Sequence, residues 1–299
     1  MPSLLDKRLV VVTGKGGAGK TTVAAALGLA AARRGKRVVL CEVAEQERLA
    51  GMLGAQPDAL LHHASVDPER AKHEWLRYQL RSRTLAGVLS GSTLFQYLTA
   101  AAPGLTELVT MGKVWDLAQL EPRAGGPAFD LAIVDAPATG HGLAMLRAPS
   151  TYASIARVGP VGRHAEKIDA FLRDPAQTGV VSVALPEEMP VNEAIEFERA
   201  LMRELQIAIE RIVVNALHPV RFSVDDYRRV EAARAESAVA RAALAAAVAE
   251  HRRARGEHAQ VRRLRHAAAA PVVTLPRIFQ PELGRHELER LSAELERRL

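Results

Sequence analysis

Short apolar runs alternate with longer helical patterns along this chain. The first run, residues 8–13, is rich in β-branched residues and leads through glycines into an alanine-rich helical pattern at 20–34. Similar runs recur at residues 37–43, 130–135, 180–185, 211–215 and 271–275. Because these runs are apolar throughout, they are typical of strands buried on both faces of a parallel sheet. We therefore predict an α/β fold with a mostly parallel sheet flanked by helices.

The second and third runs are about ninety residues apart, far more than one crossover helix requires. Helical apolar spacing in this interval and after the third run predicts an inserted helical subdomain, formed by about 60–128 and 141–177. We expect it at the carboxyl edge of the strands, where open α/β sheets bind ligands. The helical segments are predicted at 68–89, 92–102, 105–120 and 152–172. Without a linker or a repeat, the chain 1–299 is interpreted as one domain.

Two further helical regions are predicted near the end of the chain. Residues 225–266 carry ten arginines and six acids among alanines, which predicts one or two long helices with a solvated face. Leucines of the last segment, 283–299, fall near one helical face. Acids balance the arginines there, so we expect a helix packed on the sheet rather than on a membrane.

Composition narrows the class of protein. The formal net charge is +6, but its scattered arginines and scarce aromatic residues do not favour nucleic acid as a partner. The single cysteine, Cys41, excludes an intramolecular disulfide and a multi-thiol metal site in one chain. No apolar run reaches the ~20 residues that span a bilayer, and no signal segment is apparent. We expect a cytoplasmic protein.

A glycine-rich segment between the first strand and the first helix carries the chemistry. It satisfies the phosphate-loop pattern GxxxxGK[ST], whose backbone N–H groups surround phosphate oxygens at a helix N-terminus. Lys20 is expected to reach the β and γ phosphates of ATP or ADP, and Thr21 to bind Mg²⁺. The segment consists of Gly14, Lys15, Gly16, Gly17, Ala18, Gly19, Lys20, Thr21 and Thr22.

The early lysine, Lys15, gives this loop the form KGGxGKTT. That form resembles the deviant Walker A loop of dimeric ATPases, a class that includes the septum-positioning, chromosome-partitioning, arsenite-pump and tail-anchored-protein-targeting ATPases. The resemblance implies that Lys15 reaches the nucleotide of a partner chain. A cation supplied in this way neutralises charge that develops during phosphoryl transfer.

Other segments resemble the arsenite-pump and tail-anchored-targeting branch, particularly its single-domain bacterial members. Residues 133–141 look like its switch segment, which implies that Asp135 holds Mg²⁺ and leaves the roles of Thr139 and His141 open. Asn215 resembles the asparagine that reads the adenine edge, for which an amide is suited. Pro276 and Arg277 resemble the loop that walls the adenine.

One position departs from the family pattern. The family's water-positioning aspartate aligns with Ala44, and Glu42 or Glu45 is the candidate replacement, because a carboxylate within reach of water suffices. Both glutamates could equally be solvated residues near a helix start. The absence of a second phosphate loop and of a CxxC pair makes an arsenite-triggered activity and a zinc-joined dimer inconsistent with this chain.

The resulting hypothesis is a Mg²⁺-dependent ATPase that works as a homodimer, or as a heterodimer with a paralogous ATPase. Its nucleotide state would control the binding of a membrane protein or another hydrophobic client. Two alternatives stay open: a regulatory subunit that hydrolyses ATP poorly, and an ATPase of the partitioning or positioning type.

Overall fold

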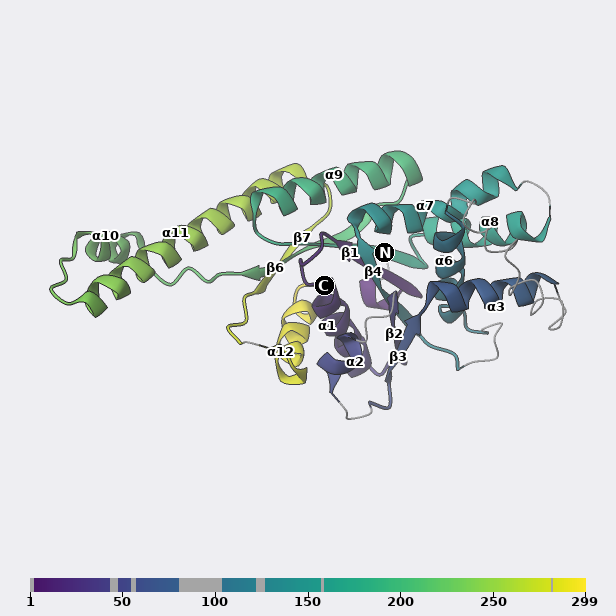
Figure 1. Ribbon diagram of the computed structural model, residues 1–299, viewed down its shortest axis with the longest axis horizontal. Helices are drawn as coiled ribbons and strands as arrows, with labels where there is room; N and C mark the ends of the chain where they lie inside the picture. The colour runs from purple at the N-terminus through teal and green to yellow at the C-terminus, as the bar shows by residue number, and fades with distance from the viewer. Residues whose placement is uncertain are drawn as a thin grey trace.

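A computed structural model describes residues 3–43, 48–54, 58–80, 104–121, 127–156, 159–280 and 282–299, with the backbone alone at 76–80. Seven strands form one sheet in the order β3-β2-β4-β1-β5-β6-β7, and every neighbouring pair is parallel. The strands are β1 (Leu9–Gly14), β2 (Val38–Val43), β3 (Leu61–Val66), β4 (Leu131–Ala138), β5 (Thr178–Ala184), β6 (Ile209–Leu217) and β7 (Val272–Pro276). The predicted α/β architecture is confirmed (Figure 1).

Six of the seven strands coincide with the predicted apolar runs, and β3 is the exception. It begins the region 60–128 that was expected to be helical, so its first residues are instead an edge strand of the main sheet. The sequence LHHASV contains no continuous apolar run, since only Leu61 and Val66 are buried. An edge strand has a neighbour on one side alone, which weakens the hydrophobic pattern that identifies it.

Alternating side chains of β1 pack in two separate hydrophobic cores, one on each face of the sheet. Leu9 and Val11 join a core with helices α6 (Leu105–Leu117), α7 (Thr139–Ile155), α8 (Pro160–Arg173) and α9 (Glu188–Leu205). Val10 and Val12 join a second core with α1 (Lys20–Arg33) and α12 (Arg285–Glu296). The sheet is therefore covered on both faces, which explains why its central strands are largely apolar.

The remaining helices complete the two layers. A short 3-10 helix, η1 (Leu4–Asp6), precedes β1, and α2 (Arg48–Leu53) lies against α1. Helix α3 (Pro68–Leu80) packs against α6, which packs in turn against α7 and α8. The predicted helical segments 68–89, 105–120 and 152–172 therefore contain helices, although α6 ends at Leu117 and the third segment is divided between α7 and α8. The predicted helix at 92–102 lies outside the described residues.

The last helix, α12, packs against α1 and β7 as the leucine pattern predicted. Leu288, Leu291 and Leu295 are buried there, with Leu288 fully so. We expect Leu288→Ala to lower the free energy of unfolding by about 2–5 kcal/mol, because it removes a transfer contribution and leaves a cavity. Denaturant unfolding measures this loss, with the exposed neighbour Arg290→Ala as the control. Equal stability of the two variants would contradict this packing.

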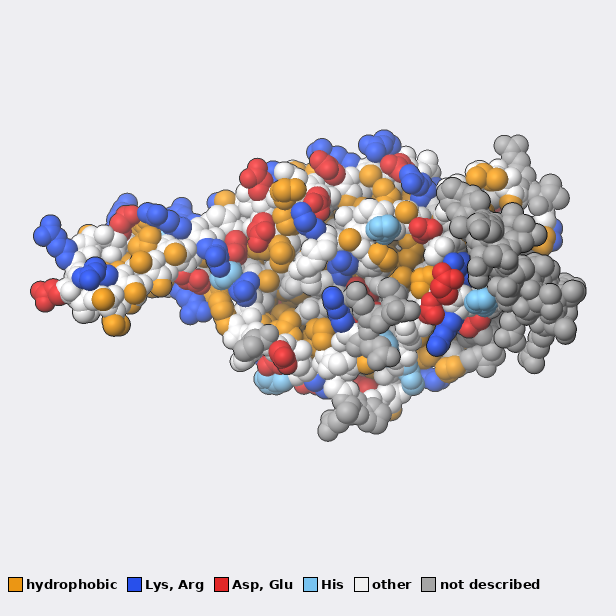
Figure 2. Space-filling view, in the orientation of Figure 1, with side chains coloured by type: hydrophobic (Ala, Val, Ile, Leu, Met, Phe, Trp, Pro, Cys, Tyr) orange, Lys and Arg blue, Asp and Glu red, His pale blue; other side chains and the backbone are white. Residues whose placement is uncertain are grey.

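Helices α10 (Val224–Ala232) and α11 (Ala238–Ala267) form a hairpin that projects from the body of the molecule (Figure 1). Ser223 and Asp226 form a capping box at the start of α10, and Ser237 caps α11. The buried residues of α11 all lie from its middle onward: His251, Ala254, Val261 and Leu264. Arginine side chains are scattered along the hairpin among apolar ones (Figure 2), as expected for a solvated helical face.

Candidate nucleotide site

The phosphate-loop segment connects the end of β1 to the start of α1, as the sequence predicted. Gly14 is required by the contact between β1 and β5, because a Cβ there would lie 2.0 Å from the backbone oxygen of Val183. Gly17 and Gly19 adopt positive φ angles of 80° and 87°, which favour glycine. The first turn of α1 has no side-chain cap among the described residues, so its N–H groups suit an anion.

Asn215, near the end of β6, braces this loop. Its Nδ2 donates a hydrogen bond of 3.0 Å to the backbone oxygen of Ala18, and the side chain is buried. A Cβ at Gly19 would lie 2.2 Å from the same nitrogen. Glycine at this position therefore leaves the space that the Asn215 amide occupies. The recognition of adenine by Asn215 stays a prediction, whereas the contact with the phosphate loop is new.

Lys20 begins α1 and points back across the loop. Its Nζ donates to the backbone oxygen of Lys15 at 3.3 Å. Burial lowers the pKa of Lys20 by penalising the charged form, while the nearby carboxylate of Asp135 acts in the opposite direction. A partly desolvated ammonium among backbone N–H groups is a suitable ligand for a phosphate oxygen.

Thr21 and Asp135 meet beside Lys20. The Thr21 hydroxyl donates a hydrogen bond of 2.6 Å to Oδ2 of Asp135, which lies near the carboxyl end of β4. The other oxygen, Oδ1, is buried and has no hydrogen-bond partner within the described parts of the chain. Burial raises the pKa of Asp135, and the neighbouring Glu42 acts in the same direction. An orphaned carboxylate oxygen next to a hydroxyl fits Mg²⁺, which prefers such ligands.

Glu42 is the partner of Asp135 in the pairing of β2 with β4, so the two carboxylates occupy neighbouring strands. The Glu42 side chain is buried and accepts hydrogen bonds from the backbone N–H groups of Arg48 and Leu49, at the start of α2. His63 Nε2 lies 3.3 Å from the same carboxylate. Glu42 therefore lies beside the site, but its carboxylate is hydrogen-bonded to the first backbone N–H groups of α2. Ala44 and Glu45 lie outside the described residues.

The rest of the predicted switch segment passes from β4 into α7. Thr13, buried at the end of β1, donates to the backbone oxygen of Pro137 at 3.1 Å, and a Cβ at Gly142 would lie 2.4 Å from its hydroxyl. Sequence reasoning missed Thr13, although a polar residue ending an apolar strand was the available signal. Thr139 is half-buried and His141 is exposed.

The predicted adenine wall follows β7. Pro276 and Arg277 are exposed, and the Arg277 backbone N–H donates to Leu217 at 2.9 Å, which joins the ends of β6 and β7. The two strand ends that carry Asn215 and Pro276 are thus adjacent in the sheet. This arrangement is compatible with the predicted adenine contacts and leaves them as predictions.

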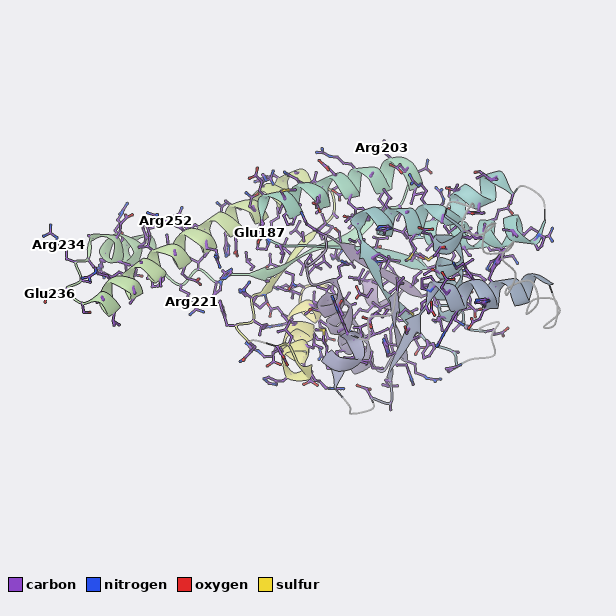
Figure 3. All side chains as sticks on the ribbon, viewed as in Figure 1. Glu187, Arg203, Arg221, Arg234, Glu236 and Arg252 are labelled. Atoms are coloured by element: carbon purple, nitrogen blue, oxygen red, sulfur yellow. The ribbon has the colours of Figure 1, made fainter. Side chains whose placement is uncertain are left out.

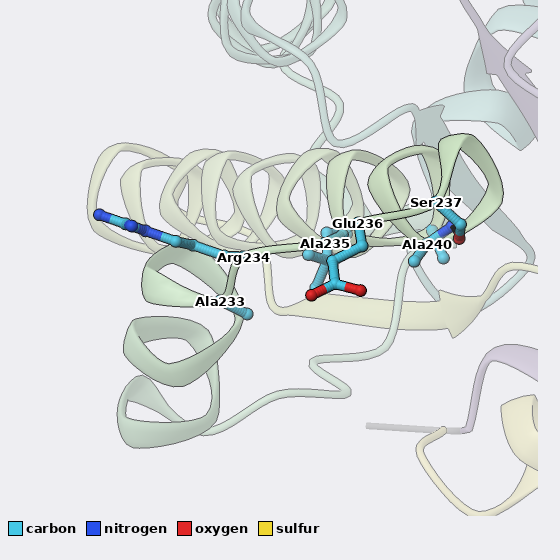
Figure 4. A pocket seen from close by; sticks show the side chains of 8 residues that line it. Ala233, Arg234, Ala235, Glu236, Ser237 and Ala240 are labelled. Carbon is cyan, nitrogen blue, oxygen red and sulfur yellow. Dashed lines mark hydrogen bonds between the residues drawn. The ribbon is translucent and has the colours of Figure 1, made fainter.

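A shallow hollow at the turn of the α10–α11 hairpin lies away from these residues (Figure 4). Small and charged side chains line it: Ala233, Arg234, Ala235, Glu236, Ser237, Ala240, Ala243 and Leu244. It contains none of the phosphate-loop residues, so we do not assign the nucleotide to it.

A parallel sheet with a glycine loop between β1 and α1, and with a carboxylate near the end of the neighbouring β4, has the fold of the P-loop nucleoside triphosphatases. The sequence profile of the family described as Anion-transporting ATPase matches residues 7–163, which include the loop and Asp135. The chain belongs to this family.

Named relatives agree with this assignment. The chain is 28% identical over 250 residues to the ATPase BagA of Mycobacterium tuberculosis, covering 79% of this chain and 73% of that protein. It is 24% identical over 275 residues to the ATPase GET3C of Arabidopsis thaliana, with 73% and 69% covered. The arsenical pump-driving ATPase of Escherichia coli is 29% identical over 196 residues, which are 65% of this chain and 32% of that protein.

Proposed function

We propose that this chain is a Mg²⁺-dependent ATPase that closes as a dimer on ATP and couples its nucleotide state to a protein client or membrane partner. The convergence of Lys20, Thr21 and Asp135 at the end of β1 carries the proposal. Lys20 and the loop N–H groups would bind the β and γ phosphates. Thr21 and Asp135 would hold Mg²⁺, which neutralises charge on the phosphate oxygens when it is bound.

In this proposal Lys15 acts on the nucleotide of the second chain. Its side chain is 35% exposed at the surface of the loop, whereas Lys20 points inward across the loop. The two lysines of one loop therefore have different surroundings, which suits two different roles. If Lys15 is supplied to the nucleotide by the second chain, ATP hydrolysis depends on formation of the dimer, in the way that an arginine finger supplied by another protein controls hydrolysis.

The dimer is tested by light scattering with a non-hydrolysable ATP analogue and Mg²⁺. We expect the unmutated chain to dimerise and Lys15→Ala to stay monomeric while still binding the analogue. Phosphate release by Lys15→Ala should fall about 100-fold, in line with the loss of one group that stabilises transition-state charge. Dimerisation of Lys15→Ala at the same concentration as the unmutated chain would contradict the assigned role.

A regulatory subunit that hydrolyses ATP poorly is the second candidate, favoured by Ala44 and by the contacts of Glu42. If Glu42 serves only the start of α2, none of the described carboxylates is assigned to the attacking water. Steady-state phosphate release by the purified chain distinguishes the two functions. Turnover that is reduced in Glu42→Gln supports the enzyme, and tight ATP binding without turnover supports the regulatory subunit.

No helix within the described ranges is long and apolar enough to cross a bilayer. The client in this proposal is defined by class alone, as a protein or a membrane partner that responds to the open and closed forms of the dimer.

A further inference from the structure

Lys15 already has an ionic partner within its own chain. Its Nζ lies 2.7 Å from Oε1 of Glu193, close enough for a hydrogen-bonded ion pair. About a third of each side chain is exposed, 35% for Lys15 and 32% for Glu193. The pair is thus accessible from solvent, at the surface where a second chain would have to approach the loop.

The fold fixes the place of Glu193 relative to the loop. Strand β5 pairs directly with β1, with Gly14 opposite Val183, and α9 starts four residues after β5 ends. Glu193 lies in the second turn of α9, near the end of the helix that Glu187 marks in Figure 3. The short connection between β5 and α9 therefore brings this carboxylate beside the first lysine of the loop.

The ion pair competes with the role proposed for Lys15. An ammonium held against α9 of its own chain has to leave that carboxylate before it reaches the phosphates of a second chain. Glu193 touches neither the phosphate-loop backbone nor Asp135 in the hydrogen bonds described, so its contact is specific to Lys15.

We propose that Glu193 is a positioning residue that holds Lys15 in its own chain and releases it when two copies close on ATP. This inference rests on the proposed dimeric function. The pair thereby opposes assembly without nucleotide, and the charge of the partner's phosphates replaces the charge of Glu193 when the dimer forms.

The size of the effect follows from the exposure of the pair. A partly exposed ion pair changes an equilibrium by a factor of about 1.4 to 5. Because each of two symmetric copies opens one pair, the factors multiply to about 2- to 30-fold in the dimer dissociation constant. Removing the carboxylate should therefore tighten the nucleotide-bound dimer by this amount.

Sedimentation of the full chain over a range of concentrations, with Mg²⁺ and a non-hydrolysable ATP analogue, tests this inference. We expect Glu193→Gln to lower the dimer dissociation constant about 2- to 30-fold. Glu193→Asp, which keeps the charge, should stay closer to the unmutated chain. Glu196→Gln, at an exposed position one turn further along the same helix, is the matched control and should not change the constant.

The outcomes separate this inference from the proposed function. If the unmutated chain dimerises and Glu193→Gln dimerises no more tightly than Glu196→Gln, the positioning role is wrong and the ATPase proposal stands. If neither the unmutated chain nor Glu193→Gln dimerises, the dimer and the positioning role both fail. Thermal unfolding of each variant shows whether the substitution has altered the fold instead.

Discussion

Replacing Lys20 by alanine will weaken the binding of ATP and slow its hydrolysis. Lys20 is the partly desolvated cation whose Nζ donates to the backbone oxygen of Lys15, and burial lowers its pKa while the nearby carboxylate of Asp135 acts in the opposite direction. A charge-assisted contact with phosphate contributes about 1.5–3 kcal/mol, so affinity should fall about 10- to 150-fold. Turnover should fall about 100- to 1,000-fold, because the same cation stabilises the charge of the transition state.

Titration with a fluorescent ATP analogue and steady-state phosphate release measure the two losses. Lys167→Ala is the matched control, since Lys167 is exposed on α8 and far along the chain from the loop. Both variants should unfold at similar temperatures. Retention of normal affinity by Lys20→Ala would show that the triphosphate binds elsewhere on the molecule.

Replacing Asp135 by asparagine will raise the unfolding temperature of the chain and lower its ATPase activity. The amide can still accept the hydrogen bond from Thr21, but it carries no negative charge for Mg²⁺. Phosphate release should therefore fall about 100-fold or more at saturating Mg²⁺ and ATP. In the absence of nucleotide and metal, the variant should unfold about 1–3 °C above the unmutated chain, because a buried charge has been removed.

The pH dependence of this stability difference follows from the raised pKa of Asp135. A carboxyl group whose pKa is raised by folding stabilises the native state fully below its unfolded pKa. That contribution is lost as the pH rises through the folded value. The difference between Asp135→Asn and the unmutated chain should thus grow from acidic to neutral pH. A constant difference in thermal unfolding across this range would contradict the cause assigned to the shift.

The sequence predicts those features that depend on local order along the chain. The central strands β1, β2, β4, β5 and β6 are largely apolar because both their faces are buried, and β7 at one edge has a similar apolar run, so all six are recognisable. The phosphate loop is equally local, since its glycines and Lys20 follow one another directly. The other edge strand, β3, is not recognisable in this way, because only its first and last residues are buried.

Two of the contacts that sequence reasoning missed join residues far apart in the chain. Lys15 and Glu193 are brought together only by the pairing of β1 with β5. The brace between Asn215 and Ala18 depends in the same way on the order of β1, β5 and β6 in the sheet. Glu42 was identified as a candidate, but its hydrogen bonds to the start of α2 could not be predicted without the fold. Strand order determines the contacts of Lys15 and Asn215, and no local pattern encodes it.

A mixing experiment tests the central claim, that two chains share their ATP sites through Lys15. Lys15→Ala and Lys20→Ala are each expected to be inactive alone, for different reasons. In an equal mixture, half of the dimers combine the two variants, and each of these contains one site with an intact Lys20 and a Lys15 from the partner. The account predicts that phosphate release returns to about a quarter of the unmutated rate. A mixture that stays as inactive as its two components would contradict it.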